Sequence, residues 1–332
     1  MKNTIDRNDY FYDNIKFILI FVVVVGHYCE KYSESILLSS VFTFIYSFHM
    51  PLFIFLSGYF SKNIESQRIK DITNLLIPYL IIQVLYFIIL ALANPAYKWS
   101  LLLPIGANWY LLGLFVWRIL APYFRQTRYA LYYAIGIGLL VGMLPDLNQT
   151  LNLQRIFTYL PFFIFGYQFT GNYKEKLLFK SIWFSIVFWV FFAFFVVSGL
   201  YFPEIVSVIK KWEITLYPFT GDFLEKLYQL FGRFMFYSMS VIISFLFLQM
   251  IPNRKTIYSE AGKNSLYVFL FHMFFIYFLV ALVPYKYGIT ELLALPVSIL
   301  LTMILSNKFV ISTLELIIYP WKIKEKFYLR KK

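Results

Sequence analysis

Long apolar runs recur along the whole chain, and they leave few folds open to it. A bilayer core is about 30 Å thick and is crossed by about 20 helical residues. Inside lipid, only helices and closed barrels satisfy every backbone polar group. Of the 332 residues, 60% are hydrophobic and 14% are charged, and the charged residues fall mainly between the apolar runs. This pattern predicts an all-α, polytopic transmembrane helix bundle rather than a soluble globular protein.

We expect about ten membrane-spanning helices. Their predicted ranges are 15–33, 38–60, 72–93, 105–124, 128–144, 153–170, 180–202, 233–251, 264–283 and 290–308. Basic residues concentrate in alternate connecting segments, beginning with the N-terminal one. The positive-inside rule therefore predicts that both termini are cytoplasmic. The plasma membrane is the expected location, and the first run is expected to remain as an uncleaved span.

The whole chain, 1–332, is predicted to form a single integral-membrane domain that ends in a basic cytoplasmic tail at about 319–332. Such a tail suits the anionic lipids of the inner leaflet. The net charge of +13 is explained by basic cytoplasmic loops, without a nucleic-acid partner. Cys29 is the only cysteine, which excludes an intramolecular disulfide and a cysteine metal cluster. With three histidines and no clustered carboxylates, we expect no metal site.

The first apolar run places two charged residues and a histidine on one helix face. Lys16 and His27 are eleven residues apart, which at 100° per residue is about 20° past three turns. Asp13 lies close to the same line. An ideal rise puts His27 about 16 Å beyond Lys16, roughly halfway through a bilayer core. His27 is therefore a candidate general base, since a free imidazole titrates near pH 6.5.

Other roles are open to these residues. Lys16 can pair with Asp13, hold an anionic ligand or extend to the membrane interface. His27 can instead bridge two helices by a hydrogen bond. His49 precedes Pro51, which should free a backbone carbonyl and kink the second run. The room beside such a kink makes His49 a second catalytic candidate, with helix-to-helix bonding as the alternative.

Five sequence segments carry a resemblance to a known family. They are DNIKF with VVVGH at 13–27, FHMPLFIFLSGY at 48–59, NWYLL at 108–112, LPFFIFGY at 160–167 and SLYVFLFH at 265–272. In this order they resemble the integral-membrane acyltransferase-3 superfamily, in particular its fucose 4-O-acetylase-like branch. The resemblance covers nearly the whole chain.

The resemblance implies about ten helices, a cytoplasmic acyl-CoA donor and transfer to a hydroxyl of a sugar or lipid-linked glycan. It also implies that His27 is the catalytic base, that the basic residue eleven positions earlier is important, and that acetyl-CoA is the default donor. The superfamily pattern has arginine at that earlier position, whereas this chain has Lys16. Lysine keeps the positive charge but loses the bidentate fork of arginine.

The residues fit such a reaction. A polyanionic coenzyme A nucleotide suits the basic inner face, and its pantetheine arm can reach toward His27 while a hydroxyl approaches from outside. Tyr46, Ser47 or His49 would orient His27 or stabilise the oxyanion. The cofactor-binding candidates are Lys16, Asp13, Arg118 and Ser57. The acceptor-binding candidates, for which interface anchoring or interhelical bonding is the alternative, are Tyr46, Asn108, Arg155, Arg233 and His272.

Two other function classes remain open at this point. A transporter or flippase for a glycan or its lipid-linked precursor would use the same polar residues to line a path. A structural partner in a glycan-synthesis complex would leave His27 facing lipid. Membrane lipids are partners in every case, and homo-oligomerisation stays open.

Overall fold

The computed structural model describes residues 10–62, 68–93, 100–148, 151–169, 180–214 and 218–321. This part of the chain is helical and contains no strand, as the apolar runs predict. The helices are α1 Tyr10–Lys31, α2 Ile36–Tyr46, α3 His49–Phe60, α4 Arg68–Asp71, α5 Ile77–Ala93, α6 Trp109–Arg125, α7 Ala130–Leu140, α8 Leu153–Gln168, α10 Ile182–Tyr201, α11 Pro203–Ile214, α12 Phe223–Met250, α13 Ser259–Gly262, α14 Ser265–Leu282, α15 Ile289–Leu305 and α16 Lys308–Ile318. The predicted basic tail from residue 322 onward lies outside the described residues.

The predicted count of ten spans is not confirmed. Among the described residues, six segments are long and apolar enough to cross a membrane, and a seventh is added if α15 and α16, bent by 68°, count as one span. The expected spans 105–124, 128–144 and 153–170 correspond to α6, α7 and α8, which have 17, 11 and 16 residues. Helix α6 is at the lower end of the range of about 17–25 residues that is usual for a bilayer crossing, and α7 and α8 are shorter than that range.

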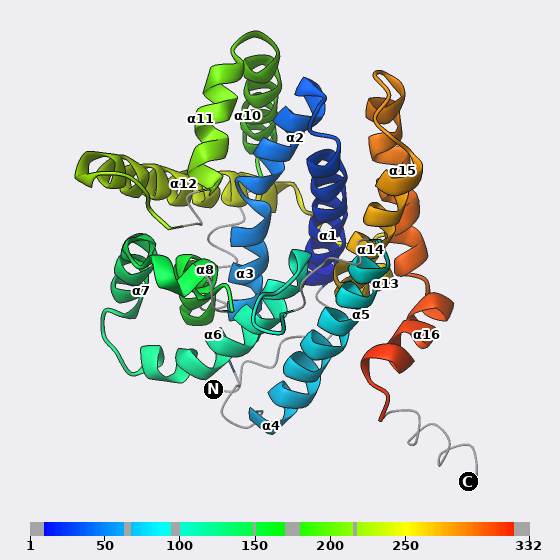
Figure 1. Cartoon of the computed structure of the whole chain (residues 1–332), viewed down its shortest axis with the longest axis horizontal. Coiled ribbons are helices and arrows are strands. Elements are labelled where there is room, and N and C mark those ends of the chain that lie inside the picture. The colour runs from blue at the N-terminus through cyan, green and yellow to red at the C-terminus, as the bar shows by residue number, and fades with distance from the viewer. Residues whose placement is uncertain are drawn as a thin grey trace.

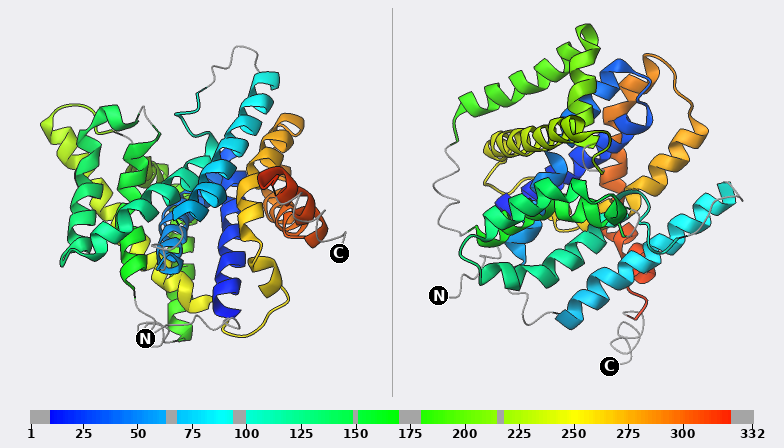
Figure 2. Two further views of the ribbon diagram at one scale, coloured as in Figure 1. Left: turned by 90° about the horizontal axis from the view of Figure 1, so that it is seen from below. Right: turned by 60° about the vertical axis from the view of Figure 1, so that its left-hand side comes forward.

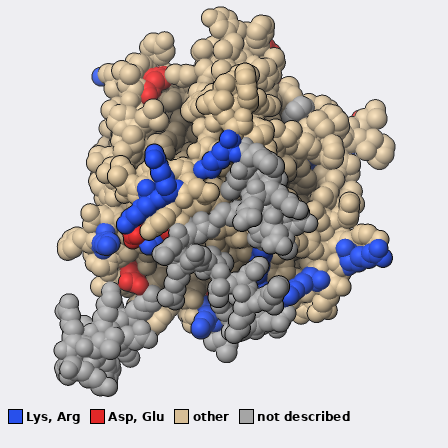
Figure 3. Space-filling model, turned by 180° about the vertical axis from the view of Figure 1, so that it is seen from behind, with Lys and Arg blue, Asp and Glu red and all other residues tan. Residues whose placement is uncertain are grey.

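Helix α1 lies in the middle of the bundle, with α2 and α3 on one side and α14 and α15 on the other (Figure 1). Views from below and from the side show the other helices arranged around it (Figure 2). On the face seen from behind, most of the surface is uncharged and most Lys and Arg side chains lie in the lower half (Figure 3). This is the half in which α4 and α16 lie in Figure 1. The asymmetry agrees with a bundle that spans lipid and has one basic end.

The first turn of α1 is fixed by Asn14, which is fully buried. Its amide nitrogen donates to the carbonyl oxygens of Pro252 and Arg254, each at 2.9 Å. Its oxygen accepts hydrogen bonds from the hydroxyls of Thr256 and Ser259. The amide thus uses both its donors and its acceptor, and it ties α1 to the segment that precedes α13.

The second span is broken between α2 and α3, as Pro51 predicts. Proline has no N–H, so the carbonyl of Ser47, four residues earlier, loses its helical partner. That carbonyl accepts a hydrogen bond from the Ser240 hydroxyl on α12 instead. The break therefore costs little hydrogen bonding, and it places His49 at the start of α3.

Helices α3 and α8 cross at two glycines. A Cβ on Gly58 would lie 2.1 Å from the carbonyl oxygen of Phe163, and one on Gly166 would lie 1.9 Å from that of Phe55. Real side chains cannot approach a backbone so closely, so only glycine permits this crossing.

Candidate active site

The three histidines of the chain meet in the middle of the bundle, although they come from α1, α3 and α14. The ring centroid of His27 lies 5.1 Å from that of His272 and 6.5 Å from that of His49. His49 and His272 are almost completely buried. The sequence predicted His27 and His49 as catalytic candidates, and the fold brings them together with the third histidine.

His27 is held by a carboxylate on its own helix. Its Nδ1 lies 2.9 Å from Oε2 of Glu30, which is three residues later and therefore on the same face. An ionised carboxylate only accepts hydrogen bonds, so Nδ1 carries the proton that is donated to Glu30. The Tyr46 hydroxyl donates to the same carboxylate oxygen at 2.9 Å and lies 2.7 Å from Nδ1. This arrangement leaves Nε2 of His27 as the basic nitrogen.

The other two imidazoles bond to their own helices. Nδ1 of His49 donates to the carbonyl of Ile45 at 2.8 Å. Nδ1 of His272 lies 2.8 Å from the carbonyl of Phe269 and 2.9 Å from that of Val268. Each neutral ring then has Nε2 as an acceptor, and Nε2 of His272 has no partner among the described residues. In this tautomer neither ring can donate to an oxyanion, but each can accept a hydrogen bond.

His27 opens onto a cavity of about 600 Å³, here called the His27 cavity. Tyr46 and His49 form part of its wall next to Glu30. Its remaining charged lining residues are Lys31, Arg155 and Lys210. The volume lies within the range of about 300–1,000 Å³ that is usual for small-molecule sites.

A second cavity of about 200 Å³, the Lys16 cavity, lies toward the start of α1. Lys16, Ser57 and Arg118 line it. Lys16 Nζ lies 3.0 Å from the Asp13 carboxylate, and Arg118 is ion-paired with Asp71 and donates to the Ser61 hydroxyl at 3.1 Å. The two cations are thus held in place from outside the cavity, because neither carboxylate lines it.

A thin aromatic layer separates the two cavities. Phe269 lines both of them, while the consecutive residues Trp109 and Tyr110 line the His27 cavity and the Lys16 cavity respectively. The Phe269 ring lies 5.0 Å from Tyr110 and 5.9 Å from Phe53, centroid to centroid. This set of side chains, with Phe269 at its centre, is called the partition below.

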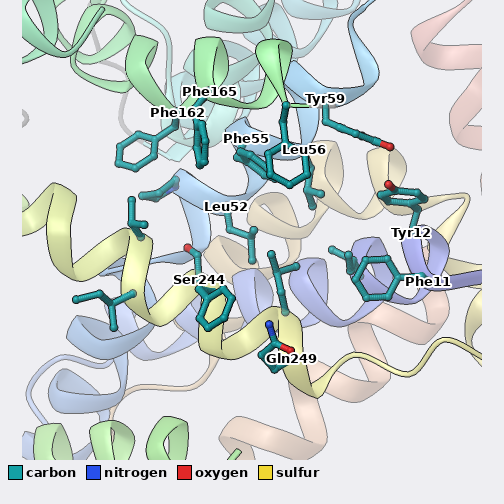
Figure 4. Close-up of a pocket in the computed structure, with 17 residues that line it drawn as sticks. Phe11, Tyr12, Leu52, Phe55, Leu56, Tyr59, Phe162, Phe165, Ser244 and Gln249 are labelled. Carbon is teal, nitrogen blue, oxygen red and sulfur yellow. The ribbon is translucent and has the colours of Figure 1, made fainter. Parts of the chain in front are cut away.

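A third cavity of about 340 Å³ lies between α1, α3, α8 and α12 and is almost entirely apolar (Figure 4). Phe55, Phe162 and Phe165 are among the residues that line it. Leu56 lines both this third cavity and the Lys16 cavity. It contains none of the three histidines. Its surroundings suit a hydrocarbon chain rather than acid–base chemistry.

The other predicted site residues are distributed as follows. Asp13 holds Lys16 but does not line the Lys16 cavity, and His272 lies against His27 without lining the His27 cavity. Asn108 does not reach either cavity, because its amide nitrogen donates to Gln83 Oε1 and to the carbonyl of Tyr79. Arg233 is fully buried elsewhere, where it donates to the carbonyls of Gly138 and Leu139. These two side chains serve helix packing in this structure.

Three charged residues of the His27 cavity, Glu30, Lys31 and Lys210, were not among the predicted site residues. Glu30 follows His27 by three positions, and that spacing was a usable signal. Lys210 comes from α11, nearly two hundred residues away, and no local pattern connects it to His27. No group of three or more His, Cys, Asp and Glu side chains that could hold a metal ion occurs within the described ranges.

Comparison with known proteins identifies the family. A family model described as an acyltransferase domain matches residues 9–307. The chain belongs to the acyltransferase-3 family. Within it, the chain is 25% identical over 194 residues to the nodulation protein NolL of Sinorhizobium fredii, which covers 52% of this chain and 51% of that protein. The chain thus matches only about half the length of this curated relative, and no solved structure matches it.

Proposed function

We propose that this membrane acyltransferase moves an acetyl group from cytoplasmic acetyl-CoA to a hydroxyl of a cell-surface or lipid-linked glycan. The observation that carries the proposal is the pair of cavities on either side of one partition. One holds an imidazole backed by a carboxylate, and the other holds two cations. Such a division suits a reaction whose two substrates arrive from opposite sides of a membrane.

The donor is assigned to the Lys16 cavity. Coenzyme A carries several phosphate charges, and Lys16 and Arg118 are the cations that line this cavity. Ser57 also lines this cavity, and its hydroxyl is 2.5 Å from that of Tyr110. The uncharged pantetheine arm would pass these hydroxyls and displace the Phe269 ring to bring its thioester to His27.

The chemistry is assigned to His27. Its Nε2 would take the proton from the acceptor hydroxyl as that oxygen attacks the thioester carbonyl. Glu30 would hold Nδ1–H and stabilise the imidazolium that forms, which is the role of the acid in a catalytic triad. Collapse of the tetrahedral intermediate breaks the C–S bond, and the imidazolium returns its proton to the thiolate of coenzyme A. The products are an O-acetyl ester and free coenzyme A.

The test is acetyl transfer by the full-length protein in lipid nanodiscs. Acetyl-labelled acetyl-CoA would be supplied, and released thiol and labelled glycan would both be measured. We expect His27→Asn to reduce transfer by about 10²-fold or more, with an unchanged thermal unfolding temperature. Full transfer by a folded His27→Asn protein would contradict the assignment.

The acceptor requires a separate experiment. Mass spectrometry of surface glycans from cells with and without the protein is expected to show the loss of an acetyl mass. Loss of a succinyl mass would correct the acyl group, and identical glycans would contradict the proposed acceptor class. The transporter alternative is supported by no specific observation in the structure.

A further inference from the structure

Three cations converge on the His27 cavity from three separate helices. Lys31 lies at the end of α1, Arg155 in the first turn of α8 and Lys210 on α11. The distribution of basic residues along the sequence predicts that all three lie on the side of the membrane opposite the cytoplasm. Lys and Arg are normally sparse on that side. Their presence around one cavity is therefore not explained by topology.

Each of the three cations lies over an aromatic ring of the cavity wall. Lys31 Nζ lies 5.0 Å from the Tyr277 ring centroid, the Arg155 guanidinium carbon 5.3 Å from that of Trp109, and Lys210 Nζ 5.2 Å from that of Phe42. These distances allow cation–π attraction, which restrains each cation at the wall.

Negative charge in the cavity is scarce. Among the described residues, Glu30 is the only acid that lines it, and one of its oxygens is already shared by His27 and Tyr46. Its other oxygen lies 3.7 Å from Lys31. Lys210 forms no ion pair within the described part of the chain. The described lining residues of the His27 cavity therefore carry three cationic side chains and one acidic one.

We propose that the acceptor carries a phosphate group, which Lys210, Arg155 and Lys31 hold while the reacting hydroxyl faces His27. A phosphate group is anionic as a diester, and as a monoester it has a charge of about −1.5 to −2 at pH 7 and three acceptor oxygens, which suits several cations. The cavity of about 600 Å³ has room for a sugar as well. The phosphate would belong either to a lipid-linked sugar or to a soluble or polymeric glycan. The role as acceptor rests on the proposed function, whereas the phosphate site does not.

The test measures binding in the absence of any acyl donor. The full-length protein in phosphatidylcholine nanodiscs would be titrated with glucose and glucose 6-phosphate as one pair of probes, and with farnesol and farnesyl phosphate as the other. The first pair represents a soluble phosphate and the second a lipid phosphate. We expect at least one phosphorylated probe to bind about tenfold more tightly than its neutral partner, as one charge-assisted hydrogen bond allows.

Lys210→Gln should remove most of that preference. The control is Lys286→Gln, which changes an exposed lysine that is likewise assigned to the outside but does not line the cavity. Equal binding of neutral and phosphorylated probes would overturn the proposal, and so would an equal loss in the two variants. Phosphate-dependent binding without acetyl transfer to any acceptor would support the phosphate site and contradict the proposed function. Acetyl transfer to neutral glycans alone would support the proposed function and contradict the phosphate site.

Discussion

At the residue scale, the contact between His27 and Glu30 is the clearest chemical feature of the molecule. It fixes the tautomer in which Nε2 is the base. Glu30→Gln keeps the shape of the side chain but removes the charge that stabilises an imidazolium. We expect a fall in kcat of about 10²-fold with little change in the KM for acetyl-CoA. Steady-state kinetics of the nanodisc protein checks this.

The matched control for Glu30 is Glu34→Gln, four residues further along and beyond the end of α1, where the residue is exposed and does not line the cavity. It should retain normal kcat and KM. An equal loss of rate in the two variants would show that turnover depends on the total negative charge of this region and not on the contact with His27.

Lys16 is expected to act on donor binding rather than on chemistry. Lys16→Gln should raise the KM for acetyl-CoA by about tenfold, because a charge-assisted hydrogen bond contributes about 1.5–3 kcal/mol. Lys16→Arg keeps the charge and should restore most of the affinity. Lys70→Gln, an exposed residue of α4, is the control. A normal KM in Lys16→Gln would remove Lys16 from the donor site.

Local spacing allowed some of these residues to be predicted and not others. Lys16 and His27 share one helix, so their common inward orientation followed from helical periodicity. His272 lies 245 positions after His27, and only tertiary packing of α14 against α1 brings their rings together. Lys210 was inaccessible to sequence reasoning for the same reason. The roles assigned to His27, His49 and Lys16 stay predictions until activity is measured.

At the scale of helices, the crossing of α3 and α8 should tolerate no side chain at Gly166. A Cβ there would meet the backbone of Phe55 at 1.9 Å. We expect Gly166→Ala to lower the free energy of unfolding by about 1–3 kcal/mol, the usual cost of overpacking. Gly136→Ala is the control, because nothing lies within 4 Å of a Cβ at that position. Thermal unfolding in detergent compares the two, and equal stabilities would contradict the close crossing.

The partition offers a second prediction at this scale. Phe269 is the residue that lines both cavities, so a smaller side chain should join them. Phe269→Ala is expected to raise hydrolysis of acetyl-CoA in the absence of acceptor, because water gains access to the thioester. Phe269→Leu should show a weaker effect and protects the test against loss of folding. Phe278→Ala, 66% exposed on the same helix, should leave hydrolysis unchanged.

The apolar content of the sequence predicts the positions of the helices better than their ends. The kink at Pro51 was predictable, because a missing N–H has a fixed consequence four residues earlier. The three expected spans between 105 and 170 were apolar enough, but their helices have only 17, 11 and 16 residues. Helix α7 ends after 11 residues and continues as a short 3-10 turn at Val141–Met143. Where helices stop inside an apolar run depends on packing partners that the sequence does not display.

At the scale of the whole molecule, the proposed reaction requires that the two cavities are reached from opposite sides of the membrane. If acetyl-CoA reaches Lys16 from the cytoplasm, then the end of α1 near Lys31 must face outward. Single cysteines introduced as Lys70→Cys and Glu34→Cys test this, since both positions are exposed. The native Cys29 is fully buried and gives a low background. In intact cells, a membrane-impermeant maleimide is expected to label Glu34→Cys but to reach Lys70→Cys only after permeabilisation. The wild-type chain should remain unlabelled in both conditions.

The reverse labelling pattern would place the His27 cavity on the cytoplasmic side. The donor would then have to enter the His27 cavity and the acceptor the Lys16 cavity, which would contradict the proposed assignment.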